Sequence, residues 1–255
     1  MSEELKQAAR VHYSFLPDHY EDEWLEVATR LQPRAILGGD YCSLVPLGRR
    51  RFAACITDAT GHNLASALYA ARINTYVLTN ILQGQDPCQL VTGLNRFLCR
   101  NLTDSGIYAS FFVVYLDAEA GEVQYAGAGH PAALHYSDAD GQINWLESQT
   151  TLLGLEYPLP VDCPHRAVPF GQGDRLLLYT DGLTEARDSS GSQFGRSGIS
   201  RYANSNSGTG NDEFVAGLCT TACDYSQGNL TDDVLCLGIR VKPDGQNGTR
   251  ANTDG

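Results

Sequence analysis

The chain has 255 residues, which suits one large domain or two small ones, and 42% of them are hydrophobic, as is typical of a globular protein. The formal net charge is -12 and no basic face is concentrated along the sequence, so we expect no nucleic-acid partner. No apolar run approaches the roughly 20 residues of a transmembrane helix, and we expect a cytoplasmic protein with no membrane span.

The first hundred residues predict a helix, three strands and two further helices. Residues 1–16 carry an apolar stripe (Leu5, Ala8, Val11 or His12, and Phe15), which predicts a helix, either a true N-terminus or the stub of a linker from an upstream domain. Strands are predicted at "WLEVATRLQP", at 41–47 and at 51–57. Long helices are predicted at 64–81 and at 87–101, with Pro87 suited to a first turn.

The rest of the chain returns to strands. "YASFFVVYLD", "EVQYAGAG", "AALHYSD" and "INWLES" are separated by turn sequences, and "DRLLLYTDG" and "DDVLCLGIRV" are later buried strands with a helix between them. Residues 188–212 are rich in Ser, Gly and Asn, which predicts a mobile flap with at most a short helix, and 242–255 read as a disordered tail. This order of elements predicts an α+β fold, with one domain over residues 17–241.

The eight cysteines include no Cys-x-x-Cys pair, and none lies at zinc-finger spacing from a histidine. We interpret them as reduced thiols, most of them buried, which agrees with a cytoplasmic location.

Five aspartates lie where apolar strands meet turns, and this recurrence is the first functional signal. They are Asp40, Asp58, Asp181, Asp232 and Asp233. Strand ends from different parts of a chain can meet at one edge of a sheet, where several carboxylates would repel one another unless a cation joined them. Ligands that are all oxygen favour Mg²⁺ or Mn²⁺ over zinc. The alternative is that each aspartate merely caps a turn, which is plausible for one of them but less so for four.

Several short motifs of the sequence together resemble those of a known family. "GGDYCS", "TDATGHN", "AGAGHPAALHY", "LLLYTDGLTEA" and "TDDVLCLGIRV" occur in the order found in metal-dependent protein phosphatases of the PPM family, closest to its bacterial SpoIIE/RsbU-type branch. The resemblance covers about residues 16–241. It implies an α-β-β-α layered β-sandwich flanked by helix pairs, with two Mn²⁺ or Mg²⁺ ions at one end.

Carried over to this chain, the resemblance implies that Asp58 bridges both ions and that the backbone carbonyl of Ala59 adds a ligand. Asp40 would reach one ion through bound water. His62 is a candidate donor to the phosphate or to the leaving oxygen, the alternative being a histidine that is bonded to backbone at a helix start. The family often has Gly-His-Gly, whereas Asn63 follows the histidine here.

On the other side of the implied site stand Asp181 and Asp232. Asp232 is preferred to Asp233 because the last ligand of the family is the first residue of its acidic pair. Glu185, one turn beyond Asp181, could bind a weak third ion. Asp58 and Asp181 are therefore expected to be essential for catalysis.

The resemblance implies hydrolysis of phosphoserine or phosphothreonine on a partner protein, such as an anti-sigma-factor antagonist in a partner-switching pathway. Two alternatives remain from the sequence: a partner-binding module without turnover, and a small-molecule phosphohydrolase. The N-terminal helix could pair with its copy in a homodimer, or it could pack on its own domain.

Overall fold

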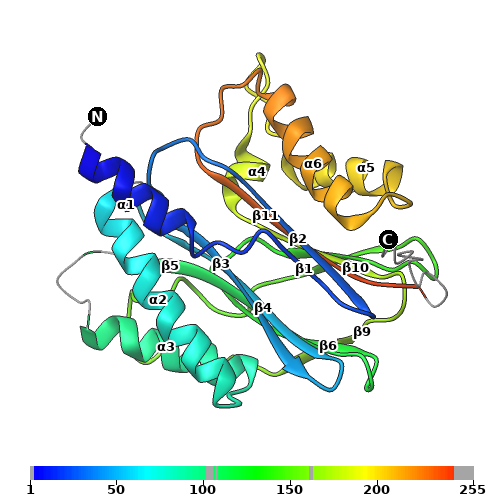
Figure 1. Cartoon of the computed structure of the whole chain (residues 1–255), viewed down its shortest axis with the longest axis horizontal. Coiled ribbons are helices and arrows are strands. Elements are labelled where there is room, and N and C mark those ends of the chain that lie inside the picture. The colour runs from blue at the N-terminus through cyan, green and yellow to red at the C-terminus, as the bar shows by residue number, and fades with distance from the viewer. Residues whose placement is uncertain (1–2, 62, 102–105, 107, 161–162, 244–255) are drawn as a thin grey trace, which may run out of the picture.

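Two antiparallel sheets face each other in the computed structural model, which describes residues 3–61, 63–101, 106, 108–160 and 163–243 (Figure 1). The first sheet contains, in spatial order, β1 (His19–Glu21), β2 (Leu25–Gln32), β11 (Val234–Val241), β10 (Arg175–Tyr179), β7 (Ala133–Tyr136) and β8 (Ile143–Leu146). The second sheet contains β3 (Asp40–Gly48), β4 (Arg51–Ala59), β5 (Ala109–Asp117), β6 (Glu122–Ala128) and β9 (Arg166–Pro169).

Strand β4 shows why the central strands read as almost continuous apolar runs. Successive side chains of a strand point to opposite faces of the sheet. Phe52 and Ile56 pack in the core between the two sheets, whereas Ala53 and Cys55 pack against helices on the outer face. Because both faces of the strand are covered, hydrophobic residues are required at every position.

Helices cover the outer face of each sheet. Helices α2 (Leu64–Leu82) and α3 (Pro87–Asn101) pack on the second sheet, and α4 (Asp181–Glu185), α5 (Gly195–Ser205) and α6 (Asn211–Tyr225) pack on the first (Figure 1). The sequence prediction of an α+β sandwich with an α-β-β-α arrangement is confirmed. No helix in the described ranges is long and apolar enough to cross a membrane.

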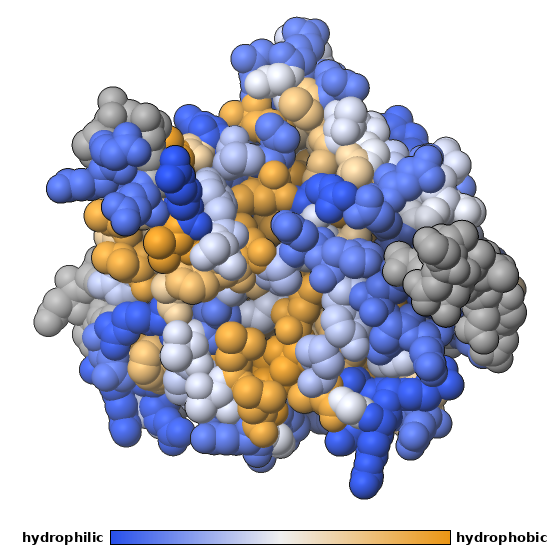
Figure 2. Space-filling model, viewed as in Figure 1, coloured by the Kyte–Doolittle hydropathy of each residue, from blue (hydrophilic) through white to orange (hydrophobic). Residues whose placement is uncertain are grey.

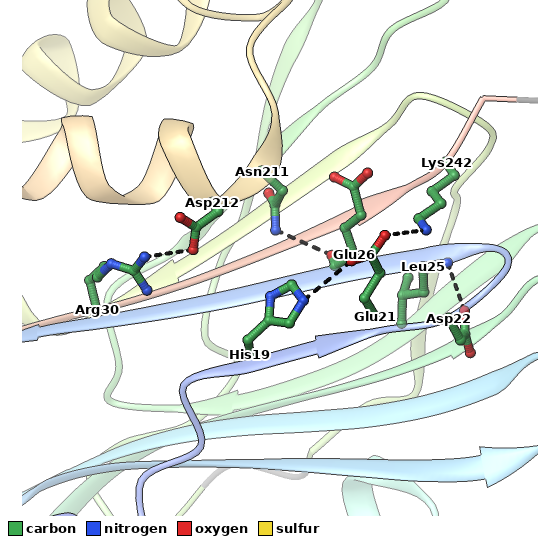
Figure 3. A network of polar contacts seen from close by, with 9 residues as sticks. All are labelled: His19, Glu21, Asp22, Leu25, Glu26, Arg30, Asn211, Asp212 and Lys242. Atoms are coloured by element: carbon green, nitrogen blue, oxygen red, sulfur yellow. Dashed lines mark hydrogen bonds and ion pairs between the residues drawn. The ribbon is translucent and has the colours of Figure 1, made fainter. Parts of the chain in front are cut away.

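The start of α6 is held against the first sheet by polar contacts (Figure 3). The side-chain amide of Asn211 donates to the carbonyl oxygens of Glu26 on β2, at 3.2 Å, and Gly238 on β11, at 2.8 Å. Arg30 forms an ion pair of 2.6 Å with Asp212 beside them. These contacts fix the helix across two neighbouring strands at its first turn.

Helix α1 (Glu3–Tyr13) packs beside α2, as one of the two alternatives from the sequence predicts. Ala9 and His12 are buried, and Ala9 contacts Leu37 and Ala67. Val11 and Phe15 nevertheless stay 52% and 47% exposed. The side chain of Leu5 lies outside the described part of the structure.

Residues 188–212 contain one short helix, as the sequence analysis allows, and the mobility expected of this stretch stays a prediction. This stretch contains α5, whose Ile199 and Ala203 are fully buried against the first sheet together with the preceding Phe194. Arg196 on the same helix binds both carboxylate oxygens of Glu147. The short strands β1 and β9 also have no counterpart in the sequence analysis. The predicted tail falls almost wholly on residues 244–255, outside the described residues.

Candidate metal centre

Asp40 and Asp58 are direct neighbours on adjacent strands. Asp40 begins β3 and Asp58 lies near the end of β4, and the antiparallel register pairs these two residues. The backbone amide of Ala59 donates to the carbonyl of Gly39 at 3.2 Å, which extends the ladder past both acids. A Cβ atom at position 39 would collide with the carbonyl oxygen of Ala59, so this close approach of the two chains requires glycine.

The first sheet contributes its acids from the ends of β10 and β11. Asp181 begins α4 directly after β10, and Asp232 precedes β11, which is hydrogen-bonded to β10. Burial and then the negative charges of Glu185 and Asp232 raise the pKa of Asp181. The four carboxylates at this end of the sandwich therefore interact electrostatically, although they come from four separate segments of the chain.

Thr180 joins the two sheets at this edge. Its hydroxyl donates a 2.8 Å hydrogen bond to Asp40 Oδ2 and accepts one of 3.0 Å from the backbone amide of Leu235. Thr180 is the N-cap residue of α4, but its side chain makes no capping bond because the hydroxyl is turned toward Asp40. The sequence analysis did not identify this residue; its position directly before Asp181 was the available signal.

Asp232 and Asp233 have different surroundings. Asp233 is buried, and its carboxylate accepts from the backbone amides of Arg34, at 2.6 Å, and Ala35, at 3.3 Å. Asp232 is exposed, and its charge acts on Asp58. Asp233 thus holds the turn before β3, while Asp232 accepts a 2.8 Å hydrogen bond from the backbone amide of Asp233, and the negative charges of both residues act on Asp40 and Asp58.

Burial, together with repulsion between these groups, raises the pKa values of Asp40, Asp58 and Asp181. Burial, followed by the charges of Asp181 and Asp232, raises the pKa of Asp58 to about 7, while a hydrogen bond with Asp40 opposes the rise. Burial, followed by the charge of Asp58, raises the pKa of Asp40 well above its usual range, and the hydrogen bond from Thr180 opposes this.

Within the described ranges, no ion pair relieves this repulsion. Over the residues that the structure describes, none of the ion pairs involves Asp40, Asp58, Asp181 or Asp232. A site with only oxygen ligands, excess negative charge and no basic partner fits a hard divalent cation.

The described acids do not by themselves surround a single ion. No three His, Cys, Asp or Glu side chains within the described residues are gathered closely enough to form a complete cage for one ion. Mg²⁺ commonly binds proteins through one or two carboxylates and retains several water molecules.

The segment that follows Asp58 leads into α2 through a capping box. The side chain of Asn63 accepts from the amides of Ala65, at 2.8 Å, and Ser66, at 3.2 Å, while Ser66 Oγ accepts from the Asn63 amide. Asn63, where the sequence departs from Gly-His-Gly, is thus the N-cap of this helix. The predicted role of His62 cannot be placed in this geometry, because this residue is outside the described ones.

His130 is bonded to the strand that lies next to Asp58. It is buried and shares a 2.7 Å hydrogen bond through Nδ1 with Ser110, the residue opposite Asp58 on β5. Burial lowers the pKa of His130 to about 3, so the imidazole is neutral at physiological pH. A neutral, buried imidazole that is bonded to a neighbouring strand fits a structural role.

Comparison with protein families and curated sequences finds one family model and two phosphoserine phosphatases that resemble this chain. Residues 48–242 match the family model described as Stage II sporulation protein E (SpoIIE). Two Bacillus subtilis (strain 168) proteins are similar: phosphoserine phosphatase RsbU, 26% identical over 190 residues, and phosphoserine phosphatase RsbP, 24% identical over 185. The matches cover 74% and 71% of this chain but 55% and 45% of those proteins, so the chain spans about half the length of these curated relatives.

Solved structures share the fold. The SiaA-PP2C domain of Pseudomonas aeruginosa superposes with a TM-score of 0.80 at 18% identity, covering 93% of this chain and 96% of that one. RsbX in complex with magnesium gives a TM-score of 0.66 at 14% identity, covering 88% and 99%. The catalytic domain of the serine/threonine phosphatase PstP with two manganese ions gives 0.61 at 15% identity, covering 86% and 99%.

Proposed function

The chain belongs to the SpoIIE family of PP2C-type phosphatases, and from this premise we propose that it is a metal-dependent phosphatase that hydrolyses phosphoserine or phosphothreonine on a partner protein. The observation that carries the proposal is the group of interacting carboxylates at one end of the sandwich, with no basic side chain paired to them among the described residues. Mg²⁺ and Mn²⁺ are the candidate ions, since solved relatives of this fold contain them.

Each acid has a proposed part in this activity. Asp58 would bridge two ions, Asp181 and Asp232 would hold one side, and Asp40 would act through water. The Ala59 carbonyl is a further proposed ligand. When bound, the two ions would supply an acidified water for attack on phosphorus and would neutralise the phosphoryl oxygens.

Three further residues have proposed roles beside these ligands. Glu185, whose charge acts on Asp181, is proposed as the ligand of a weaker third ion. Thr180 would keep Asp40 ionised and oriented, because a hydrogen bond to a carboxylate favours its charged form. His62 remains a proposed donor to the phosphate or the leaving oxygen.

For the substrate we propose a phosphorylated anti-sigma-factor antagonist in a partner-switching pathway, by analogy with the phosphoserine phosphatases RsbU and RsbP. The partner-binding module without turnover is the competing function, because a shared fold alone does not establish catalysis. A small-molecule phosphohydrolase is the second competitor.

Release of phosphate from a generic aryl phosphate with Mn²⁺ present separates catalysis from binding. We expect turnover by the natural chain and none by Asp58→Asn. A panel of candidate antagonists phosphorylated on serine, set against small phosphate esters, then identifies the substrate class. Binding of a phosphorylated antagonist without any phosphate release would favour the binding module, and faster hydrolysis of small esters would favour the third function.

A further inference from the structure

Two cysteines far apart in the sequence lie in direct contact outside the candidate metal centre. The Sγ atoms of Cys88 and Cys163 are 3.2 Å apart although 75 positions separate the two residues. Both cysteines are partly buried and are not bonded to each other. A disulfide requires the two sulfurs to approach by roughly a further 1 Å, to about 2.05 Å.

Cys88 lies in the first turn of a helix whose N-terminus is capped. Cys88 follows Pro87 in the first turn of α3, where Asp86 accepts from the amide of Gln89 at 2.8 Å and Gln89 Oε1 accepts from the amide of Asp86 at 3.1 Å. Cys163 lies three residues before β9, an edge strand that pairs with β6. A bond between the two sulfurs would tie the connection between β8 and β9 to α3.

The segment between β8 and β9 also contacts α3 through Asn95. The buried side chain of Asn95 donates to the carbonyl of Glu156 at 2.9 Å and accepts from the amide of Gly154 at 2.9 Å. Leu153 in turn pairs with Ala109, at the start of β5. The connection between β8 and β9 therefore contacts α3 at Asn95 as well as at Cys88, and both cysteines pack against the hydrophobic cluster beneath α3.

Cys88 is also accessible to a reagent. It lines a cavity of about 540 Å³ together with Arg96 and Tyr157. The other pair of neighbouring cysteines, Cys219 and Cys236, lies in the core between α6 and the first sheet, and Cys236 is completely buried. Contact between sulfurs and access from a cavity occur together at Cys88.

We propose that Cys88 and Cys163 form a redox site, in which a small-molecule disulfide such as oxidised glutathione converts the two thiols into a reversible intramolecular disulfide. The Cys88 thiolate attacks one sulfur of the reagent and displaces one small thiolate. Cys163 then loses its proton to solvent and attacks the Cys88 sulfur, which releases the second small thiol. Two protein thiols and one small disulfide give one protein disulfide and two small thiols.

The order of attack follows from the surroundings of the two thiols. Burial raises the pKa of both, but contact with its neighbour lowers that of Cys88 and raises that of Cys163 further. Cys88 is thus the more easily ionised, as well as the one that lines the cavity. Because the thiolate is the attacking species, the reaction should accelerate as pH rises above neutrality.

The test is incubation of the natural chain with oxidised glutathione, followed by alkylation of free thiols, proteolysis and mass spectrometry. We expect a peptide pair linked through Cys88 and Cys163, which dithiothreitol separates again. Cys163→Ser should instead accumulate a mixed disulfide of glutathione on Cys88, and Cys88→Ser should leave Cys163 free. The control variant Cys99→Ser/Cys223→Ser, which removes two other partly exposed thiols, should cross-link as the natural chain does.

Two results would overturn the proposal. One is full alkylation of Cys88 and Cys163 in the natural chain under conditions in which Cys99 and Cys223 become modified by glutathione. The other is a linked peptide that appears only together with a fall in the thermal midpoint, because a bond that suits the folded state must raise the midpoint.

Discussion

The hydroxyl of Thr180 donates a 2.8 Å hydrogen bond to Asp40 Oδ2, and this bond connects the first sheet to the second at the edge where the acids gather. Asp40 is buried beside Asp58, so it is costly to ionise. A donor that comes from the opposite sheet lowers this cost and fixes the direction of the carboxylate. It gives Thr180 a role in the proposed centre without direct contact with an ion.

We predict that Thr180→Val weakens the binding of Mn²⁺ by roughly 10- to 100-fold, the usual effect of removing a group that orients a metal ligand. Valine keeps the shape of the side chain but removes the hydroxyl, and Thr180→Ser should restore most of the affinity. The measurement is the Mn²⁺ concentration that gives half-maximal phosphatase rate, together with calorimetric titration of Mn²⁺. Equal metal affinity in the valine and serine variants would show that the hydroxyl has no part in positioning Asp40.

The two adjacent acids before β11 should respond differently to truncation. Asp232→Ala should abolish phosphatase activity with little change in stability, because this residue is exposed. Asp233→Ala should lower the free energy of unfolding by about 1–3 kcal/mol, because it leaves two backbone amides, those of Arg34 and Ala35, without their acceptor. Chemical denaturation and activity of both variants provide the check, and a stable, inactive Asp233→Ala beside an active Asp232→Ala would reverse the assignment.

Repulsion at the site predicts a dependence of stability on pH when chelator is present. The pKa of Asp58 is raised from 3.8 to about 7, so the folded state binds this proton more tightly than the unfolded state. The contribution to stability is complete below about pH 4 and is lost as pH rises toward 7. The thermal midpoint in EDTA should therefore fall across this range by several degrees, since about 1 kcal/mol corresponds to roughly 2–4 °C in a chain of this size.

Asp58→Asn should flatten this dependence, whereas Asp18→Asn, at an exposed position, should not. Saturating Mn²⁺ should likewise raise the midpoint at pH 7 more than at pH 5. If the midpoint of the natural chain in EDTA is the same at both pH values, the carboxylates do not repel one another as described.

Most of the fold was predictable from the sequence, because β4, β5 and the helices over 64–82 and 87–101 carry strong hydrophobic patterns. The short strands β1 and β9 could not be predicted, because strands of three and four residues with exposed polar positions have no distinct periodicity. The bounds of helix α5 could not be predicted for a similar reason: a few buried residues stand among many Ser, Gly and Asn, and burial against the first sheet outweighs their poor helix propensity.

The acids of the site could be predicted individually from their places at strand ends, and their use as metal ligands stays a prediction. What the sequence could not reveal are contacts between distant segments. The bond from Thr180 to Asp40 and the contact of Cys88 with Cys163 depend on how the two sheets and α3 come together. The distinction between Asp232 and Asp233 likewise depends on the turn at Arg34, about 200 residues away in the chain.

Exposed apolar side chains in α1 and just after it predict a homodimer. Val11 and Phe15 line an apolar groove of about 370 Å³ with Leu64 and Leu68 of α2, on the side of the molecule where Figure 2 shows hydrophobic residues gathered. We expect Val11→Ser/Phe15→Ser to shift the protein from dimer to monomer and to change the phosphatase rate. The backbone carbonyl of Phe15, which accepts from the Tyr41 hydroxyl at 2.7 Å, is kept in this variant.

Analytical ultracentrifugation at micromolar concentration measures this change. Leu82→Ser, at a position 71% exposed outside the groove, is the matched control and should leave the association state unchanged. If the natural chain is already monomeric under these conditions and the double variant has the same phosphatase rate, α1 does not form a dimer and only packs on α2.

Phosphate release from a protein phosphorylated on serine shows whether the carboxylates around Asp58 make this chain a metal-dependent phosphatase. The rate is measured with Mn²⁺, after exhaustive chelation with EDTA, and after Mn²⁺ is added back, for the natural chain and for Asp58→Asn and Asp181→Asn. We predict that chelation abolishes the rate, that Mn²⁺ restores it, and that both variants lose at least about 100-fold while they remain folded, since the ions supply most of the chemistry. A rate that survives chelation, or near-natural rates in both variants, would contradict the account.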